Sequence, residues 1–337
     1  ANSLTIGGAS VGQSGISAGG EISVTTGRGT LTANENVSST GGNVTLTATD
    51  SGSAGDNLAI SASVSVMTTA GNVTLNAGDN VTAAANAGIS ASGNVAITAD
   101  SGSVDTGGAI TLTDTSTVSS TGVGDVDLAA TGNVSLSALS TSGAVTITST
   151  AGSIIDNGNT GTDISAASAV LTAADSVGQA SGTGNGLLET TLDNVEASAT
   201  TGGVFLSNST NLIVGGASGA TGISTGTVVD LDVAGSLTVN EAVSAGTSLT
   251  FDTTNNVTVS AAVQAASGLA IVAGSDTSGG ITVTGTGSLR TTGANADISL
   301  TTGTASGNVT LAGDVTSADD LTISTFAGGT VNQTAGT

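Results

Sequence analysis

The 337-residue chain contains no proline, cysteine, histidine, tryptophan, tyrosine or lysine, and only two arginines. The lack of histidine and cysteine excludes a Ser-His-Asp triad, a thiolate nucleophile and a zinc site built on these residues. The lack of lysine excludes Schiff-base chemistry and a phosphate-loop lysine. The 25 acidic side chains give a formal net charge of −23. We expect no nucleic-acid partner, because this charge repels a phosphate backbone.

The apolar residues form 37% of the chain and are spread in short alternating runs. No run approaches the ~20 consecutive apolar residues of a membrane helix, so we expect no membrane insertion. The absence of cysteine leaves the redox compartment open.

A short phrase, Gly-Asn-Val, recurs along the chain. It occurs at 42–44, 71–73, 93–95, 132–134 and 307–309. Each copy begins an alternating run such as Val44-Thr45-Leu46-Thr47-Ala48, in which apolar and polar side chains point to opposite faces. This alternation predicts short β-strands, and no stretch of ten or more residues has helical amphipathicity. The pattern predicts an all-β protein in which the valines of this phrase point inward.

The spacing of these runs predicts the architecture. Their first apolar residues lie at Val44, Leu58, Val73, Val95, Ile110, Val126, Val134 and Val145. Successive intervals are 8 to 22 residues long and sum to about 20–30 over two or three strands, which is typical of stacked solenoid coils. At roughly 20–25 residues per coil, we expect a parallel β-helix, or β-solenoid, of roughly 14–16 coils. We expect a single continuous β-solenoid over residues 1–337, as a segment of a longer chain.

The composition agrees with such a stack. Every interior strand of a solenoid donates backbone N–H groups to the next coil, and proline cannot do so. Glycine and asparagine suit sharp corners, and stacked asparagines can form ladders along the axis.

The repeated Gly-Asn-Val-Thr-Leu phrase, with Ala, Ser, Thr and Gly between copies, resembles the passenger regions of filamentous-haemagglutinin-like adhesins of the two-partner secretion type. The resemblance covers essentially the whole chain. It implies a right-handed parallel β-helix, export through an outer-membrane pore, and a role as a surface stalk or adhesin. Two family features are missing: the Asn-Pro motifs of the secretion domain, and Arg-Gly-Asp, since Arg28 is followed by Gly29 and Thr30.

Two pairs of aspartates are the candidate metal ligands. Asp230 and Asp232 alternate with Val229, Leu231 and Val233, as Asp125 and Asp127 do with Val126 and Leu128. Each pair is expected on the outer face of its strand, where a calcium ion or solvent would screen the repulsion between the carboxylates. Calcium is therefore the one cofactor that the sequence leaves open, with general solvation as the alternative.

The same residues give little basis for catalysis. Glycoside hydrolysis needs two carboxylates, but sugar clefts also rely on aromatic platforms, and the chain has three phenylalanines. Polysaccharide-cleaving β-helix enzymes use arginine or lysine as a base, and Arg28 and Arg290 are 262 positions apart. Thr-x-Thr pairs such as Thr282/Thr284 resemble those of ice-binding solenoids. Their irregular spacing favours the alternative that these threonines are ordinary polar residues on the outer surface.

We therefore expect a non-catalytic structural or adhesive extracellular rod of a bacterial surface protein, acting as an adhesin stalk or filament. One alternative is a calcium-dependent module that binds glycans of a host or a neighbouring cell. The other is a subunit of a surface layer or fibre, which assembles with further copies of itself end to end.

Overall fold

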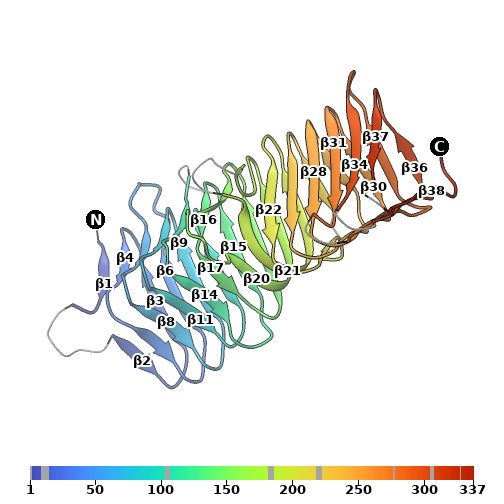
Figure 1. Cartoon of the computed structure of the whole chain (residues 1–337). Coiled ribbons are helices and arrows are strands. Elements are labelled where there is room, and N and C mark those ends of the chain that lie inside the picture. The colour runs from blue at the N-terminus through green and yellow to red at the C-terminus, as the bar shows by residue number, and fades with distance from the viewer. Residues whose placement is uncertain are drawn as a thin grey trace. The chain divides into compact units, whose positions relative to one another are not determined.

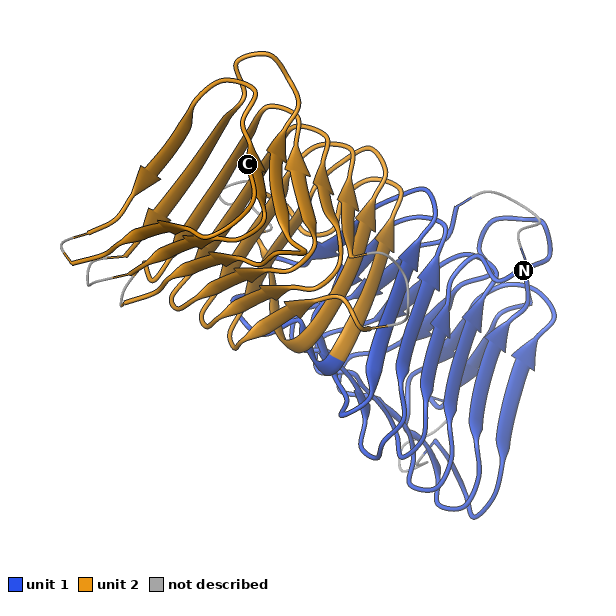
Figure 2. Cartoon of the chain, turned by 90° about the vertical axis from the view of Figure 1, so that its right-hand side faces the viewer, with its two compact units in different colours: residues 1–167 blue, residues 168–337 orange. Residues whose placement is uncertain are grey.

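The computed structural model describes residues 2–8, 15–102, 107–180, 186–217, 222–275, 278–303, 307–326 and 328–337. None of these residues is helical, about 52% of the chain is strand, and the strands pair in parallel. The described part therefore contains no helix that could cross a membrane. The chain divides into two compact units, residues 1–167 and 168–337 (Figure 2). Each unit is a parallel β-solenoid, as the sequence predicts.

In unit 1 the strands form three columns, and each strand pairs in parallel with the strand three places further along the chain (Figure 1). The first column contains β1 (Leu4–Ile6), β4 (Leu31–Ala33), β7 (Leu58–Ile60), β10 (Val81–Ala83), β13 (Ile110–Leu112), β16 (Val134–Leu136) and β19 (Ile154–Asp156). The second contains β2 (Ile16–Ala18), β5 (Val37–Ser39), β8 (Ser65–Thr68), β11 (Gly88–Ala91), β14 (Thr117–Ser120) and β17 (Ala138–Ser140). The third contains β3 (Ile22–Thr26), β6 (Val44–Ala48), β9 (Val73–Ala77), β12 (Val95–Thr98), β15 (Val126–Ala130) and β18 (Ala144–Ser149).

Two long strands interrupt this three-strand rhythm. The first is β20 (Ile164–Ala173), which contains the boundary between the units and pairs with β17 through Leu139 and Ile164. The second is β21 (Leu188–Ala199), at the start of unit 2. Its twelve residues pair in succession with β22, β23 and β24, one strand from each column of that unit. Both strands fall largely within residues 157–194, where the sequence repeat is least regular.

Unit 2 repeats the three-column arrangement. One column contains β22 (Val204–Asn208), β25 (Val229–Val233), β28 (Ser248–Thr253), β31 (Gly268–Ala273), β34 (Asp297–Thr302) and β37 (Leu321–Ser324). The next contains β23 (Leu212–Val214), β26 (Leu237–Val239), β29 (Val257–Val259), β32 (Ile281–Val283), β35 (Val309–Leu311) and β38 (Val331–Gln333). The last contains β24 (Ile223–Thr225), β27 (Val243–Ala245), β30 (Ala262–Ala265), β33 (Ser288–Thr291) and β36 (Asp314–Thr316).

The number of turns is slightly lower than expected. The chain makes about 13 turns instead of roughly 14–16, so that a turn takes about 26 residues on average. Turn length varies from 18 residues, between the paired Leu188 and Leu206, to 31 residues, between Val95 and Val126. The strands stay in register because the corner connections take up the difference.

The core of each unit is a narrow stack of aliphatic side chains. The five valines of the Gly-Asn-Val phrase, Val44, Val73, Val95, Val134 and Val309, are all fully buried, which confirms that they point inward. In unit 1, Val44, Val73, Val95, Val126 and Val145 follow one another in a single column. Burial of this apolar area stabilises the fold by about 25 cal/mol per Å².

Asparagine side chains connect the turns at one corner of unit 1. The Oδ1 atom of Asn43 accepts the N–H of Asn72 at 2.9 Å, and that of Asn72 accepts the N–H of Asn94 at 2.9 Å. Asn94 does the same for Asp125 at 3.0 Å, and Asp125 for Ala144 at 2.8 Å. The predicted asparagine ladder is confirmed, and it explains why asparagine precedes the strand.

Inward hydroxyl groups close the same corner. Ser39, the last residue of β5, donates to the carbonyl of Gly20 at 2.6 Å, and Thr68, the last residue of β8, donates to that of Gly42 at 2.6 Å. In unit 2, Thr302 donates to the carbonyl of Gly307 at 3.1 Å. A buried carbonyl without a partner costs about 1–3 kcal/mol, so these hydroxyls satisfy corner carbonyls that the strand ladders leave over.

Candidate functional site

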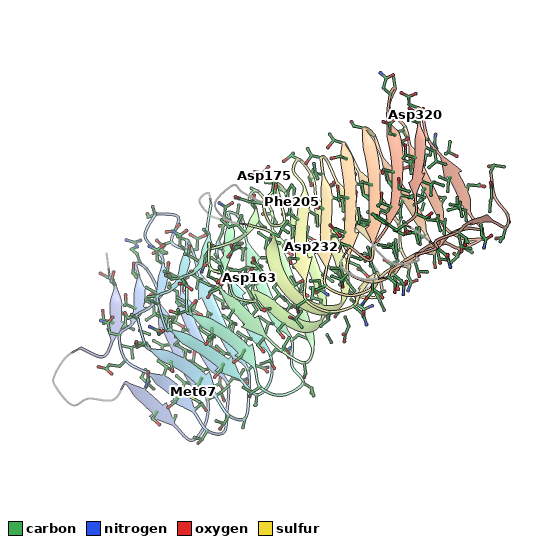
Figure 3. The ribbon with its side chains drawn as sticks, in the orientation of Figure 1. Met67, Asp163, Asp175, Phe205, Asp232 and Asp320 are labelled. Carbon is green, nitrogen blue, oxygen red and sulfur yellow. The ribbon has the colours of Figure 1, made fainter. Side chains whose placement is uncertain are left out.

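The aspartates Asp230 and Asp232 of β25 lie on the outer face of unit 2, as predicted. Asp232 is labelled in Figure 3. Their neighbours Val229, Leu231 and Val233 are fully buried. A third aspartate joins them, because Asp252 of β28 is the parallel-register partner of Asp232. We refer to Asp230, Asp232 and Asp252 as the acidic patch.

Burial and mutual repulsion raise the pKa values of two carboxyl groups in the acidic patch. Partial burial raises the pKa of Asp230 above its ordinary value of 3.8, and the charges of Asp232 and Asp252 raise it further. The pKa of Asp232 is raised by partial burial first and by Asp252 second. Phe205 of β22 lies beside Asp230 in the same sheet, so an aromatic side chain borders the patch (Figure 3). A cation with oxygen ligands would relieve the repulsion.

The pair Asp125 and Asp127 is different in unit 1. Asp125 precedes β15 at the corner, and one of its carboxylate oxygens is a rung of the asparagine ladder, accepting the N–H of Ala144. Asp127 lies on the outer face opposite Thr146 of β18. Partial burial raises the pKa of Asp127, the hydrogen bond from Thr146 opposes this, and the charge of Asp125 adds to the rise. Asp125 therefore has a structural role at the corner besides its place in the pair.

Buried aspartates at another corner of unit 1 escaped the sequence analysis. Asp56 is 2% exposed, and its carboxylate accepts the N–H of Gly29 and both the N–H and the hydroxyl of Ser51, the latter two at 2.7 and 2.6 Å. The Ser51 hydroxyl is the main cause that lowers the pKa of Asp56, helped by backbone N–H groups and the charge of Arg28 against the opposing effect of burial. Asp79 in turn accepts the N–H of Asp56 at 2.8 Å. These carboxylates hold successive turns together.

A second buried pair in unit 1 is Asp156, at the end of β19, and Asp163. They are 1% and 0% exposed, and their carboxylate oxygens lie within 4.8 Å of each other. Asp156 accepts the N–H of Gly158 at 2.9 Å. Two carboxylates this close are candidate ligands for a cation, whose positive charge would offset the repulsion between them. No sequence motif marked this pair, because the two residues meet only through the fold.

The two arginines occupy separate settings. Arg28 lies in unit 1, where its charge acts on Asp56. Arg290 lies in unit 2 on β33, exposed, between Gln264 and Thr316 in register. Both arginines are exposed, and the register partners of Arg290 are neutral residues.

Comparisons of the chain with protein-family models, curated proteins and solved structures found no match. The fold itself makes the chain a β-helix repeat protein. Its sequence motif thus has a structural explanation in the asparagine ladder and the inward valines.

Proposed function

We propose that the chain is a structural and adhesive extracellular rod of a bacterial surface protein, an adhesin stalk or filament, and that it carries out no catalysis. The observation that supports this most directly is the in-register parallel stack within each unit. In unit 2, for example, all six residues of β28 pair with the six residues of β31, and these with the six of β34. In such a stack the number of turns determines the length of the solenoid, and a stalk requires a defined length.

The resemblance to filamentous-haemagglutinin-like passenger regions belongs to the same proposal. The phrase that carries the resemblance supplies a buried valine and an asparagine rung in each copy at the asparagine corner of unit 1. The outward positions hold threonine, serine and aspartate, and a surface of this kind with a net charge of −23 resists aggregation outside the cell. We propose an extracellular, cell-surface location on these grounds.

Surface display tests the proposal. The chain, fused to an anchor on a non-adherent bacterium, is expected to increase attachment to host cells or clumping between bacteria relative to the anchor alone. A matched control carries the same fusion with Val95→Pro, which breaks the backbone ladder inside unit 1. A displayed, protease-resistant wild-type chain that adds no attachment and no clumping would contradict the adhesive function.

A calcium-dependent surface-binding module is the second candidate, and the acidic patch together with the buried pair Asp156 and Asp163 favours it. Calcium that binds only the folded state raises stability by RT ln(1 + [L]/Kd), or about 2.7 kcal/mol at a hundredfold excess over Kd. We expect chelation to lower the thermal unfolding midpoint. In the Asp252→Asn variant, the difference in midpoint between calcium and chelator should be smaller than in the wild type. An equal midpoint with calcium and with chelator excludes a structural calcium site.

Contact between copies is the third proposal. Parallel strands pair in register from turn to turn within each unit, as Ile298 does with Leu321 and Val309 with Val331 in unit 2. We propose that copies of the chain extend this pairing and assemble end to end. Electron microscopy of the purified chain is expected to show head-to-tail fibres, and single particles at all concentrations would refute this assembly.

A further inference from the structure

We propose that unit 2 carries a binding groove for a neutral saccharide chain, an inference that rests on the adhesive function proposed above. The groove is a hollow of about 480 Å³ that runs over β29, β32 and β35. This volume lies in the range of about 300–1,000 Å³ typical of small-molecule sites.

A column of hydroxyl groups forms the floor of the groove. Thr258, Thr282 and Thr310 are outward residues of the three strands and are register partners in that order. Parallel strands lie about 4.7–4.9 Å apart, so the three hydroxyls form an evenly spaced row. Each hydroxyl can donate one hydrogen bond and accept others. Thr238 of β26 continues the same column but lies outside the hollow.

One of the residues in the lining of the groove is Gly280. Asn256, Gly280 and Asn308 occupy the same position on successive turns, two residues before each threonine. Asn256 accepts the N–H of Gly280 at 2.9 Å, but Gly280 has no side chain to continue the ladder to Asn308. A Cβ atom at position 280 would come within 2.9 Å of the carbonyl oxygen of Asn308. Gly280 thus lets the backbone of Asn308 approach closely, between the exposed side chains of Asn256 and Asn308.

The chemistry of the lining selects the class of ligand. The described residues that line the groove offer hydroxyl, amide and glycine backbone groups, and none of them carries an acidic or basic side chain. A divalent cation would require carboxylates. An anionic ligand would meet the field of a chain with a net charge of −23. A neutral, hydroxyl-rich ligand matches these groups, because its hydroxyls pair with donors and acceptors on threonine and asparagine alike.

Calorimetry on the full chain tests the inference, with cellohexaose, maltohexaose and chitohexaose as neutral probes. Oligogalacturonate of the same length is the charged control, and a neutral peptide tests the other ligand class. We expect at least one neutral saccharide to bind. Thr282→Val/Thr310→Val keeps the β-branched shape but removes two hydroxyls, and it should weaken binding about tenfold. The matched control Thr238→Val removes a hydroxyl of the same column outside the groove and should leave the affinity unchanged.

A second variant adds a side chain at Gly280. Gly280→Ser introduces the residue type found at Ser236, the matching position beside Thr238, and its Cβ atom would displace the Asn308 carbonyl in the lining. It should also weaken binding, with far-ultraviolet circular dichroism confirming the fold. The inference is overturned if none of the neutral saccharides binds at millimolar concentration. It is also overturned if the peptide binds instead, or if Thr238→Val and the double variant have equal effects. The attachment assay is independent of these outcomes, so failure of the groove and failure of the adhesive function are distinguishable.

Discussion

Removal of one complete turn from unit 2 is the sharpest test of the solenoid. Val233, the last residue of β25, is the register partner of Thr253, the last residue of β28. Deletion of residues 234–253 therefore joins Val233 to Thr254 and places β25 where β28 was. Val229 and Leu231 would then stack on Leu269 and Ile271, which lie two turns further on in the intact chain.

The cost of this deletion should be small. A folded protein is stabilised by about 0.05–0.15 kcal/mol per residue, so the loss of 20 residues should lower the free energy of unfolding by about 1–3 kcal/mol. The corner ladder is preserved as well, because Asn211, which accepts the N–H of Ser236 at 2.8 Å, would accept that of Asn256 instead. Such an asparagine-to-asparagine rung already exists between Asn43 and Asn72.

Urea unfolding followed by far-ultraviolet circular dichroism measures the effect, since the chain has no tryptophan or tyrosine for fluorescence. The control is deletion of residues 234–243, half a turn, which joins Val233 to Ser244 and puts the following strands out of their columns. We expect the full-turn deletion to unfold cooperatively close to wild type and the half-turn deletion to lose the strand signal. Equal damage from both deletions would refute the reasoning, because stability would then not depend on register.

Two further predictions follow from single residues. Val95→Pro removes the N–H that donates to the carbonyl of Asp125 at 2.9 Å inside unit 1 and should cost about 3 kcal/mol in urea unfolding, whereas Val95→Ala keeps this hydrogen bond and isolates the packing loss. Tolerance of the proline would argue against a ladder at this position. The pKa values of Asp230 and Asp232 are raised in the folded state, so their contribution to stability is present below pH 3.8, the ordinary value. The free energy of unfolding should fall as the pH rises from there past the raised pKa values. Asp252→Asn should raise the free energy of unfolding at pH 7 by about 0.2–1 kcal/mol and change it little at pH 3. Asp114→Asn, an exposed aspartate of unit 1, is the matched control, and an equal gain from it would disprove the repulsion in the acidic patch.

The fold was predictable because its strongest signals are local. Two-residue alternation and the Gly-Asn-Val phrase identify strands such as β6, β9 and β12, and the absence of proline agrees with continuous ladders. Strands such as β8 and β11 were harder to recognise, because their inward positions mix Val66 and Ile89 with Thr68 and Ala91. The long strand β21 has no repeated phrase at all.

The candidate sites depend on contacts between turns, which spacing alone does not give. The outward direction of Asp230 and Asp232 follows from alternation, but their proximity to Asp252 depends on the register of β25 and β28. The threonine column of the groove was missed for the same reason. Thr238, Thr258, Thr282 and Thr310 are 20, 24 and 28 residues apart, since connections of different length separate strands that are nevertheless in register.

The corner ladder has a consequence for the chemical ageing of this protein. Asparagine is thermolabile, and its hydrolysis to aspartate would normally introduce a charge where an amide was needed. Here Asp125 already occupies the position equivalent to Asn94. Its Oδ1 atom accepts the N–H of Ala144 at 2.8 Å, just as the amide Oδ1 of Asn94 accepts the N–H of Asp125. Asp314 accepts the N–H of Thr337 in unit 2 at 3.0 Å in the same manner. An asparagine rung that hydrolyses to aspartate thus keeps its acceptor for the N–H of the next turn.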